Sequence, residues 1–428
     1  MSRFNAILLL ALAAFVSPAF SDDAPDSTTT RARIVRPLPP PQGEVLRPGN
    51  VAPPQPQPAD IDPETGLARS TVVRPLREFP APPGARAAPQ GGVPPGAVAG
   101  PRAPGHIALI LPTASPALGK LADAVRQGFA TAVKVGGRDG PPVDLIAIPD
   151  EGDSLLAACR QAQAGGAILV VAAITRGGAS TLAQSDCARQ PVLELNEPQG
   201  IRPEELPPNL FTVSLSTERE AAQVALMAVA DGHRSAIVIA SSTPLARRVE
   251  EAFEREWTRA AGEVKRVPFE GDPDEALALR ASLETSSADM AFIALDPGQA
   301  RAIRPYIPAT LPLYATSLSV NPRAETLVNL DLQGLRYLEM PWFIQPDHSA
   351  VMVYPQPATP MSVDQERLYA FGIDAYRLAL HLLRGEARKS PLDGVTGKIT
   401  LGPGNTFERT LTPAEVDGGH VIPLRATP

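Results

Sequence analysis

Cysteine is scarce in this sequence: its 428 residues contain two, Cys159 and Cys187. So few thiols exclude a disulfide-rich scaffold and make a poor cysteine-based metal centre. Both cysteines fall in helices that the hydrophobic pattern predicts one after the other. Neighbouring helices on one face of a sheet can bring two cysteines within bridging distance in an oxidising compartment. The pair therefore forms either a disulfide or two buried free thiols.

Signatures of catalysis and of metal binding are also missing. The sequence contains no GxSxG, HExxH or SxxK motif with its partner residues, and we therefore predict no enzyme activity and no cofactor. Its histidines share no metal-ligand spacing, so we expect no metal; they are His106, His233, His348, His381 and His420. The net charge of −7, with acidic and basic residues interspersed, argues against a nucleic-acid partner.

Long hydrophobic runs are missing as well. The unbroken apolar run from Ala6 to Val16 is shorter than the roughly 20 residues of a membrane-spanning helix. Arg3 precedes this run, and the small residues Ala19 and Ser21 follow it. This order is typical of a secretory signal peptide, so we predict that residues 1–21 are cleaved on export; an uncleaved membrane anchor is the alternative. No cysteine lies near the cleavage site, and we expect no lipid anchor.

Proline, in contrast, is abundant, and it is concentrated in one segment. Residues 22–105 hold 20 of the 49 prolines and show no apolar periodicity. Such a composition cannot bury enough apolar surface to offset the entropy lost on ordering. We predict a disordered arm, partly polyproline II, that acts as a spacer.

From His106 onward, short apolar runs alternate with amphipathic helical segments. The predicted strands are 106–112, 143–149, 167–174, 191–196, 210–217, 235–240, 263–269, 289–295 and 311–317. Near-continuous apolar strands that alternate with helices predict parallel sheets covered on both faces. Thr217 and Glu220 have the spacing of a capping box at the start of one of these helices.

The run from Gly334 to Pro346 is strand-like and lies between two blocks of this alternation, so we interpret it as a crossover between two lobes. A buried helix is expected at 367–385 and a hairpin at 397–411. With crossovers near 213, 340 and 390, the predicted fold is α/β with two Rossmann-like lobes. Lobe one is assigned residues 106–212 plus 340–390, and lobe two is assigned residues 213–339 plus 391–428.

Three sequence runs resemble the C-terminal domain of the LpoA-type activators of penicillin-binding proteins: LPLYATS (311–317), EMPW (339–342) and RLYAFGIDAY (367–376). The resemblance implies a type I periplasmic-binding-protein-like fold and a location in the periplasm. It also implies a non-catalytic regulator that binds a class A penicillin-binding protein and stimulates peptidoglycan synthesis. The alternative function is a solute-binding protein that captures an amino acid or similar small molecule between its lobes for an ABC transporter.

Open α/β sheets bind ligands at the carboxyl ends of their strands. Polar residues at these ends are candidates for an interlobe ligand site: Ser115, Thr175, Arg176, Asn196, Glu197, Ser241, Ser242, Asp296, Thr316 and Ser317. Arg176 would be the counter-ion for a carboxylate. The alternative is that these residues cap helices, as Ser, Thr and Asp commonly do.

Overall fold

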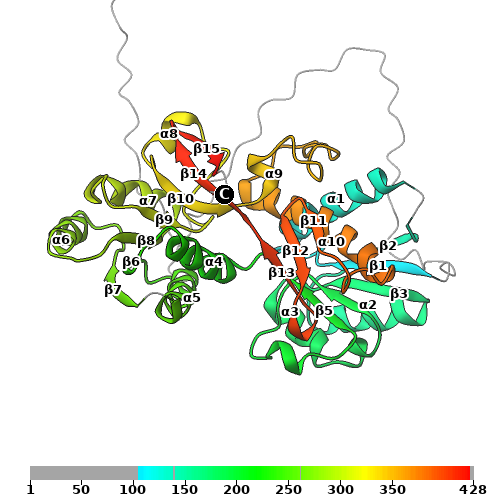
Figure 1. Ribbon diagram of the computed structural model, residues 1–428. Helices are drawn as coiled ribbons and strands as arrows, with labels where there is room; N and C mark the ends of the chain where they lie inside the picture. Colours follow the sequence, from blue (N-terminus) through cyan, green and yellow to red (C-terminus); the bar gives the residue numbers. More distant parts are fainter. Residues whose placement is uncertain (1–104, 138–139, 261, 425–428) are drawn as a thin grey trace, which may run out of the picture. The chain divides into compact units, whose positions relative to one another are not determined.

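The computed structural model describes residues 105–137, 140–260 and 262–424. The predicted signal peptide and, except for Gly105, the predicted proline-rich arm lie outside the described residues. Two mainly parallel sheets, each covered by helices, make up the described part and confirm the predicted two-lobed α/β fold (Figure 1). We name the lobe of the first sheet lobe one and that of the second sheet lobe two.

The eight-stranded sheet of lobe one has the order β11-β12-β13-β5-β4-β3-β1-β2. Its strands are β1 (His106–Leu111), β2 (Val143–Ala147), β3 (Ala167–Ala172), β4 (Val192–Glu194), β5 (Leu210–Val213), β11 (Leu392–Gly394), β12 (Gly397–Leu401) and β13 (Thr406–Thr410). The first five strands are parallel to one another and mostly apolar, and except for the edge strand β2 they are largely buried. β11, β12 and β13 form an antiparallel meander that joins the edge of β5.

Helices cover both faces of this sheet. α1 (Gly119–Gly136) and α10 (Val363–Leu383) pack together on one face, and α2 (Asp153–Ala164) and α3 (Arg176–Ala183) cover the other. The closest approach of α1 and α10 is at two glycines. A Cβ atom on Gly128 would lie 1.8 Å from the carbonyl oxygen of Tyr369, and one on Gly372 would lie 2.1 Å from that of Val125. These two helices can therefore touch only because both positions lack a side chain.

The seven-stranded sheet of lobe two has the order β15-β14-β10-β9-β8-β6-β7. Its strands are β6 (Ser235–Ala240), β7 (Glu263–Pro268), β8 (Met290–Ala294), β9 (Leu313–Ala315), β10 (Leu335–Glu339), β14 (Thr412–Asp417) and β15 (His420–Pro423). α4 (Thr217–Ala230) and α5 (Pro244–Ala260) cover one face, and α6 (Pro273–Glu284) and α7 (Pro297–Ile303) cover the other. A short helix, α8 (Thr326–Leu330), precedes β10.

The chain passes between the lobes three times, and two of the three places match the prediction. The first passage follows β5 at Ser214, and the second follows β10 at Met340. The third was expected near 390, but the structure places it at Leu411, between β13 and β14. The segment 391–411 therefore belongs to lobe one, not to lobe two as assigned from the sequence.

This difference arises because β13 pairs with β5, a strand almost 200 residues earlier in the chain. Phe407 lies opposite Val213 in parallel register, and its ring contacts that of Phe211 with centroids 6.4 Å apart. Arg409 is buried and donates from Nε to the Ser214 carbonyl oxygen at 2.9 Å. The predicted hairpin at 397–411 is confirmed, but the local sequence pattern could not identify β5 as the strand with which it pairs.

The strand-like run 334–346 also ends earlier than predicted. β10 stops at Glu339, and α9 (Pro341–Ile344) is a short helix with Pro341 at its first position. Proline favours that position because its fixed φ suits a helix and its missing N–H is not needed there. Likewise α10 begins four residues before the prediction, because Ser362 and Gln365 form a capping box at its start.

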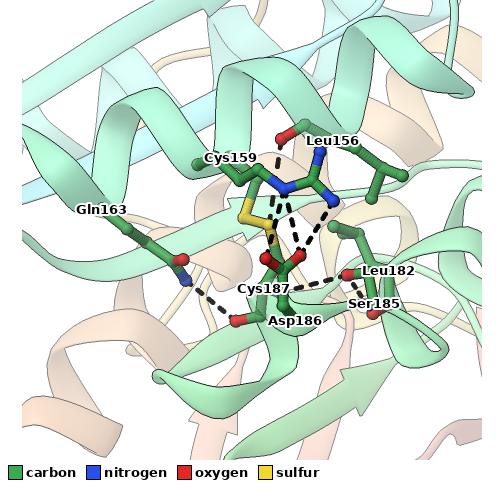
Figure 2. Close-up of a disulfide and its surroundings, with 8 residues drawn as sticks. Leu156, Cys159, Gln163, Leu182, Ser185, Asp186 and Cys187 are labelled. Atoms are coloured by element: carbon green, nitrogen blue, oxygen red, sulfur yellow. Dashed lines mark hydrogen bonds and ion pairs between the residues drawn. A yellow bond between two sulfur atoms is a disulfide. The ribbon is translucent and has the colours of Figure 1, made fainter.

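The two cysteines are joined in a disulfide that links α2 to the 3₁₀ turn η1 (Asp186–Arg189) (Figure 2). Polar contacts run beside it: Gln163 Nε2 donates to the Cys187 carbonyl oxygen at 2.9 Å, and Arg160 pairs with Asp186 at 3.0 Å. The second cysteine was expected in an α-helix, but α3 ends at Ala183. Of the two open possibilities, the structure shows the bridged form.

Candidate functional site

A cavity of about 180 Å³ lies between the two lobes, where the sequence places a ligand site. The lining from lobe one lies at the ends of β3 and β4 and on α10: Ile174, Arg176, Leu195, Asn196, Leu368 and Phe371. The lining from lobe two lies at the start of α4 and on α5: Leu215, Ser216, Thr217, Glu218, Leu245 and Arg248. Ligand pockets for drug-sized molecules have volumes of roughly 300–1,000 Å³. The cavity alone is smaller than this range, and it adjoins a surface hollow of about 390 Å³ that shares Arg176, Ser216, Glu218 and Arg248.

One carboxylate joins the two lobes across this cavity. Glu218 Oε1 accepts from Arg176 Nη2 of lobe one at 2.6 Å and from Arg248 Nε of lobe two at 2.8 Å. Glu218 Oε2 accepts from the hydroxyl of Ser216 at 2.9 Å. Burial alone would raise the pKa of Glu218, but the hydrogen bond from Arg248 and the charge of Arg176 outweigh it and leave the pKa below its ordinary value.

Of the residues predicted from the sequence, Arg176 and Asn196 line the cavity. Asn196 Nδ2 donates to the carbonyl oxygen of Ile174 at 2.9 Å, so it connects the ends of β3 and β4. Glu197 lies in the adjoining surface hollow, where it accepts from Ser214 Oγ at 2.6 Å and from Arg219 Nε at 2.8 Å. Asn196 and Glu197, which both follow β4, are therefore engaged in contacts within the protein.

Five other candidates make local backbone or side-chain contacts outside the cavity lining. Thr175 caps α3 by accepting from the N–H of Gly178, and Asp296 caps α7 by accepting from those of Gly298 and Gln299. Ser115 accepts from Leu118 N at 3.3 Å. Ser241 Oγ contacts Thr243 Oγ1 at 3.3 Å, and the N–H of Ser242 donates to Glu270 at 2.6 Å. Capping and turn contacts account for these positions.

Thr316 and Ser317 are buried at the end of β9, away from the cavity lining. Ser317 donates from N and from Oγ to Glu220 Oε2, at 3.2 and 2.7 Å. Glu220 was expected to close a capping box with Thr217. In the structure Ser216 is the cap of α4 and accepts from Arg219 N, while Glu220 points inward.

A second set of charges is buried where the chain crosses between the lobes. Arg367 on α10 pairs with Glu339 of β10 at 3.0 Å, and the two side chains are 12% and 1% exposed. Near them, burial raises the pKa of Glu220 and lowers that of Arg409, and each charge partly offsets the shift of the other. Arg409 Nη1 also donates to the Thr396 carbonyl oxygen at 3.1 Å.

Sequence reasoning missed ten of the twelve residues that line the cavity, among them Glu218, Arg248, Leu368 and Phe371. These four come from the N-terminal parts of α4, α5 and α10, whereas the prediction considered only polar residues in the loops after strands. The acidic first turn after Ser216 could have predicted Glu218 as a cleft residue, because a helix that starts where the chain crosses between the lobes begins beside the cleft. The apolar positions on α10 carried no such signal.

Among residues 105–137, 140–260 and 262–424, no group of three or more His, Cys, Asp or Glu side chains is arranged to hold a metal ion. Across the same ranges, no helix combines the length and the apolar character needed to cross a membrane.

The sequence is similar to proteins named "Penicillin-binding protein activator LpoA". That of Histophilus somni (strain 129Pt) is 30% identical over 239 residues, which cover 54% of this chain and 40% of that protein. That of Escherichia coli (strain K12) is 25% identical over 309 residues, which cover 62% and 45%. The chain thus spans less than half the length of these curated relatives.

Solved structures show the same fold. "LpoA (YraM) C-domain from Haemophilus influenzae, a regulator of PBP1A" has a TM-score of 0.62 at 21% identity, over 75% of this chain and all of that one. A "putative branched-chain amino acid ABC transporter" from Chromobacterium violaceum has a TM-score of 0.63 at 34% identity, over 73% of this chain and 99% of that one.

The family model described as "LppC putative lipoprotein" matches residues 101–419, which include both lobes and all three crossings. The three runs that carried the resemblance, 311–317, 339–342 and 367–376, all lie inside this range. The chain therefore belongs to the LppC family.

Proposed function

We propose that this chain is a non-catalytic regulator in the periplasm that binds a class A penicillin-binding protein and activates it in peptidoglycan synthesis. Membership of the LppC family supports this, together with relatives that are named as penicillin-binding protein activators. The Haemophilus influenzae domain described as a regulator of PBP1A is matched over its whole length by the two lobes described above. The proposal therefore concerns the part of the chain that these relatives share.

The observation that carries the proposal is the internal pairing of charges across the cleft. Arg176 of lobe one and Arg248 of lobe two share the carboxylate of Glu218, and the remaining cavity measures about 180 Å³. The described lining contains no histidine, lysine or cysteine that could act as a base or nucleophile, and the Ser216 hydroxyl is engaged by Glu218 and by the backbone of α4. A folded surface, not the cleft, is then what a partner would recognise.

The disulfide is consistent with export. Disulfides form and persist in oxidising compartments such as the bacterial periplasm and are rare in the cytosol. Cys159 and Cys187 are both fully buried within the core of lobe one. A periplasmic location thus agrees with the predicted signal peptide.

The alternative function, a solute-binding protein for an ABC transporter, uses the same fold, and fold alone does not decide between the two. The similarity to the Chromobacterium violaceum protein would be expected for either. The relatives named as penicillin-binding protein activators favour the regulator, and in the cleft the Glu218 carboxylate already occupies both arginines.

The test uses the full chain and a purified class A penicillin-binding protein from the same genome. We expect the chain to bind the synthase in affinity capture and to raise its rate of glycan polymerisation or of peptide cross-linking with lipid-linked precursor as substrate. Chain unfolded by heat in the presence of reductant is the matched control for non-specific effects. Failure to bind or to stimulate, combined with capture of a permease and thermal stabilisation by an amino acid, would establish the solute-binding function instead.

A further inference from the structure

The cleft between the lobes contains a complete set of contacts for a carboxylate, and the protein itself supplies that carboxylate. Arg176 and Arg248 donate to one oxygen of Glu218, and Ser216 donates to the other. Guanidinium groups and hydroxyls are the donors that proteins use to hold carboxylate ligands, and hydrogen bonds between charged groups are the stronger kind. The arrangement has the form of a binding site whose ligand is a side chain.

The surroundings of this carboxylate are those of a small amphipathic ligand. Six apolar side chains line the rest of the cavity: Ile174, Leu195, Leu215, Leu245, Leu368 and Phe371. Polar groups at one end of an otherwise apolar pocket fix the orientation of a ligand, while the apolar walls supply contact area. Removal of the Glu218 side chain would add its volume to this cavity and leave the two arginines without their shared partner.

The position of Arg176 is fixed independently of Glu218. Two residues of the turn before it, Ile174 and Thr175, donate their backbone N–H groups to the carboxylate of Glu151 at 2.8 and 2.9 Å. Just before them, Ala173 is buried and has a φ of 63°, a conformation that residues with a Cβ rarely adopt. Backbone strain of this kind persists where surrounding contacts hold it, and here they hold the start of α3 against the cleft.

We propose that Arg176 and Arg248 form a binding site for a small aliphatic carboxylate, and that Glu218 occupies this site as an internal ligand. The intact protein then holds its lobes together without an external molecule. Both arginines are partly exposed, at 41% and 45%, so an external carboxylate binds well only when Glu218 no longer competes for them. This inference concerns the cleft alone and does not depend on a penicillin-binding protein partner.

The test compares the wild-type chain with Glu218→Ala, using 3-methylbutanoate as the probe and 3-methylbutanol, which has the same carbon skeleton, as the uncharged control. Binding is followed by calorimetry and by the melting temperature at constant ionic strength. We expect Glu218→Ala to bind the carboxylate at least tenfold more tightly than the wild type does, with a saturable rise in melting temperature. The alcohol should have no such effect on either protein.

Two further variants make the result specific. Glu284→Ala removes an exposed carboxylate from the surface pair with Arg280 and should behave as the wild type. Adding Arg176→Gln to Glu218→Ala should abolish the gained binding. If Glu218→Ala does not fold, Glu218→Ser, which also removes the carboxylate and most of the side-chain volume, provides the same comparison. Equal affinity in wild type and variant, or no binding in either, would overturn the proposal.

Discussion

Glu194 is a carboxyl group buried in the middle of the lobe-one sheet. It lies on β4 between β3 and β5, its exposed fraction is 0%, and among the described residues neither of its oxygens has a hydrogen-bond partner. Burial, with a smaller contribution from the negative charge of Glu151, raises the pKa of Glu194 from 4.5 to about 9. The group is therefore neutral in the folded protein at pH 7.

This shift makes the free energy of unfolding depend on pH. Below about pH 4.5 the carboxyl is protonated in both the folded and the unfolded chain, and burial adds no pH-dependent cost. Between 4.5 and about 9 the folded chain keeps the proton that the unfolded chain has released, so stability falls as pH rises. At pH 7 this cost is at most about 3 kcal/mol, from about 1.4 kcal/mol per pH unit.

Glu194→Gln tests this directly, because glutamine has nearly the shape of the neutral acid but does not titrate. We expect the variant to be about 1–3 kcal/mol more stable than the wild type at pH 7 and equally stable near pH 4.5. The measurement is urea unfolding of both proteins from pH 4.5 to 8, with the disulfide intact. Glu284→Gln, at an exposed position, should track the wild type throughout. A stability difference that does not change with pH would refute the reasoning.

Three further predictions follow from the packing. Gly128→Ala should lower the free energy of unfolding by about 3 kcal/mol, because its Cβ would meet a backbone carbonyl, while Gly136→Ala on the same helix meets only the Tyr376 ring at 3.5 Å and should be neutral. Arg409→Met should lower the free energy of unfolding by about 1–3 kcal/mol in urea unfolding, since it removes the donor to the carbonyl oxygens of Ser214 and Thr396 and a charge that partly offsets the burial of Glu220, and a wild-type midpoint would contradict this. Cys159 and Cys187 are 28 residues apart in the sequence, so reduction of their disulfide should lower the free energy of unfolding by about 3 kcal/mol. The effect should appear as a lower melting temperature in reductant.

Local pattern was sufficient for the parallel strands of both sheets, but not for β11, β14 and β15. β6 begins and ends where the apolar run SAIVIA does, and β1 differs from its predicted strand by one residue, because strands buried on both faces are nearly continuous apolar runs. The α/β alternation then determined the two lobes. What local pattern could not supply was the partner of β13, since pairing across almost 200 residues depends on where the third crossing places the chain.

The candidate site was predicted less well than the fold, for a related reason. The carboxyl ends of β3 and β4 do face the cleft, as Arg176 and Asn196 show. However, a residue after a strand has two physically similar uses, capping the next helix or facing the other lobe, and the sequence does not distinguish them. Thr175 and Asp296 cap helices, whereas Glu218, within a helix, faces Arg176 across the cleft. Which use prevails depends on the contacts between lobes.

Those contacts bear on how a binding-protein fold can serve as a regulator. Where the chain crosses between the lobes, Arg367 of lobe one pairs with Glu339 of lobe two, and both side chains are nearly inaccessible to water. Breaking a buried ion pair by removing one partner costs about 3–5 kcal/mol, because the remaining charge stays desolvated. In a solute-binding protein the ligand joins the two lobes, whereas here Glu218 of lobe two already pairs with Arg176 of lobe one. A protein partner that recognises both lobes would then meet them in one fixed arrangement and would not have to order them on binding, which lowers the entropic cost of association.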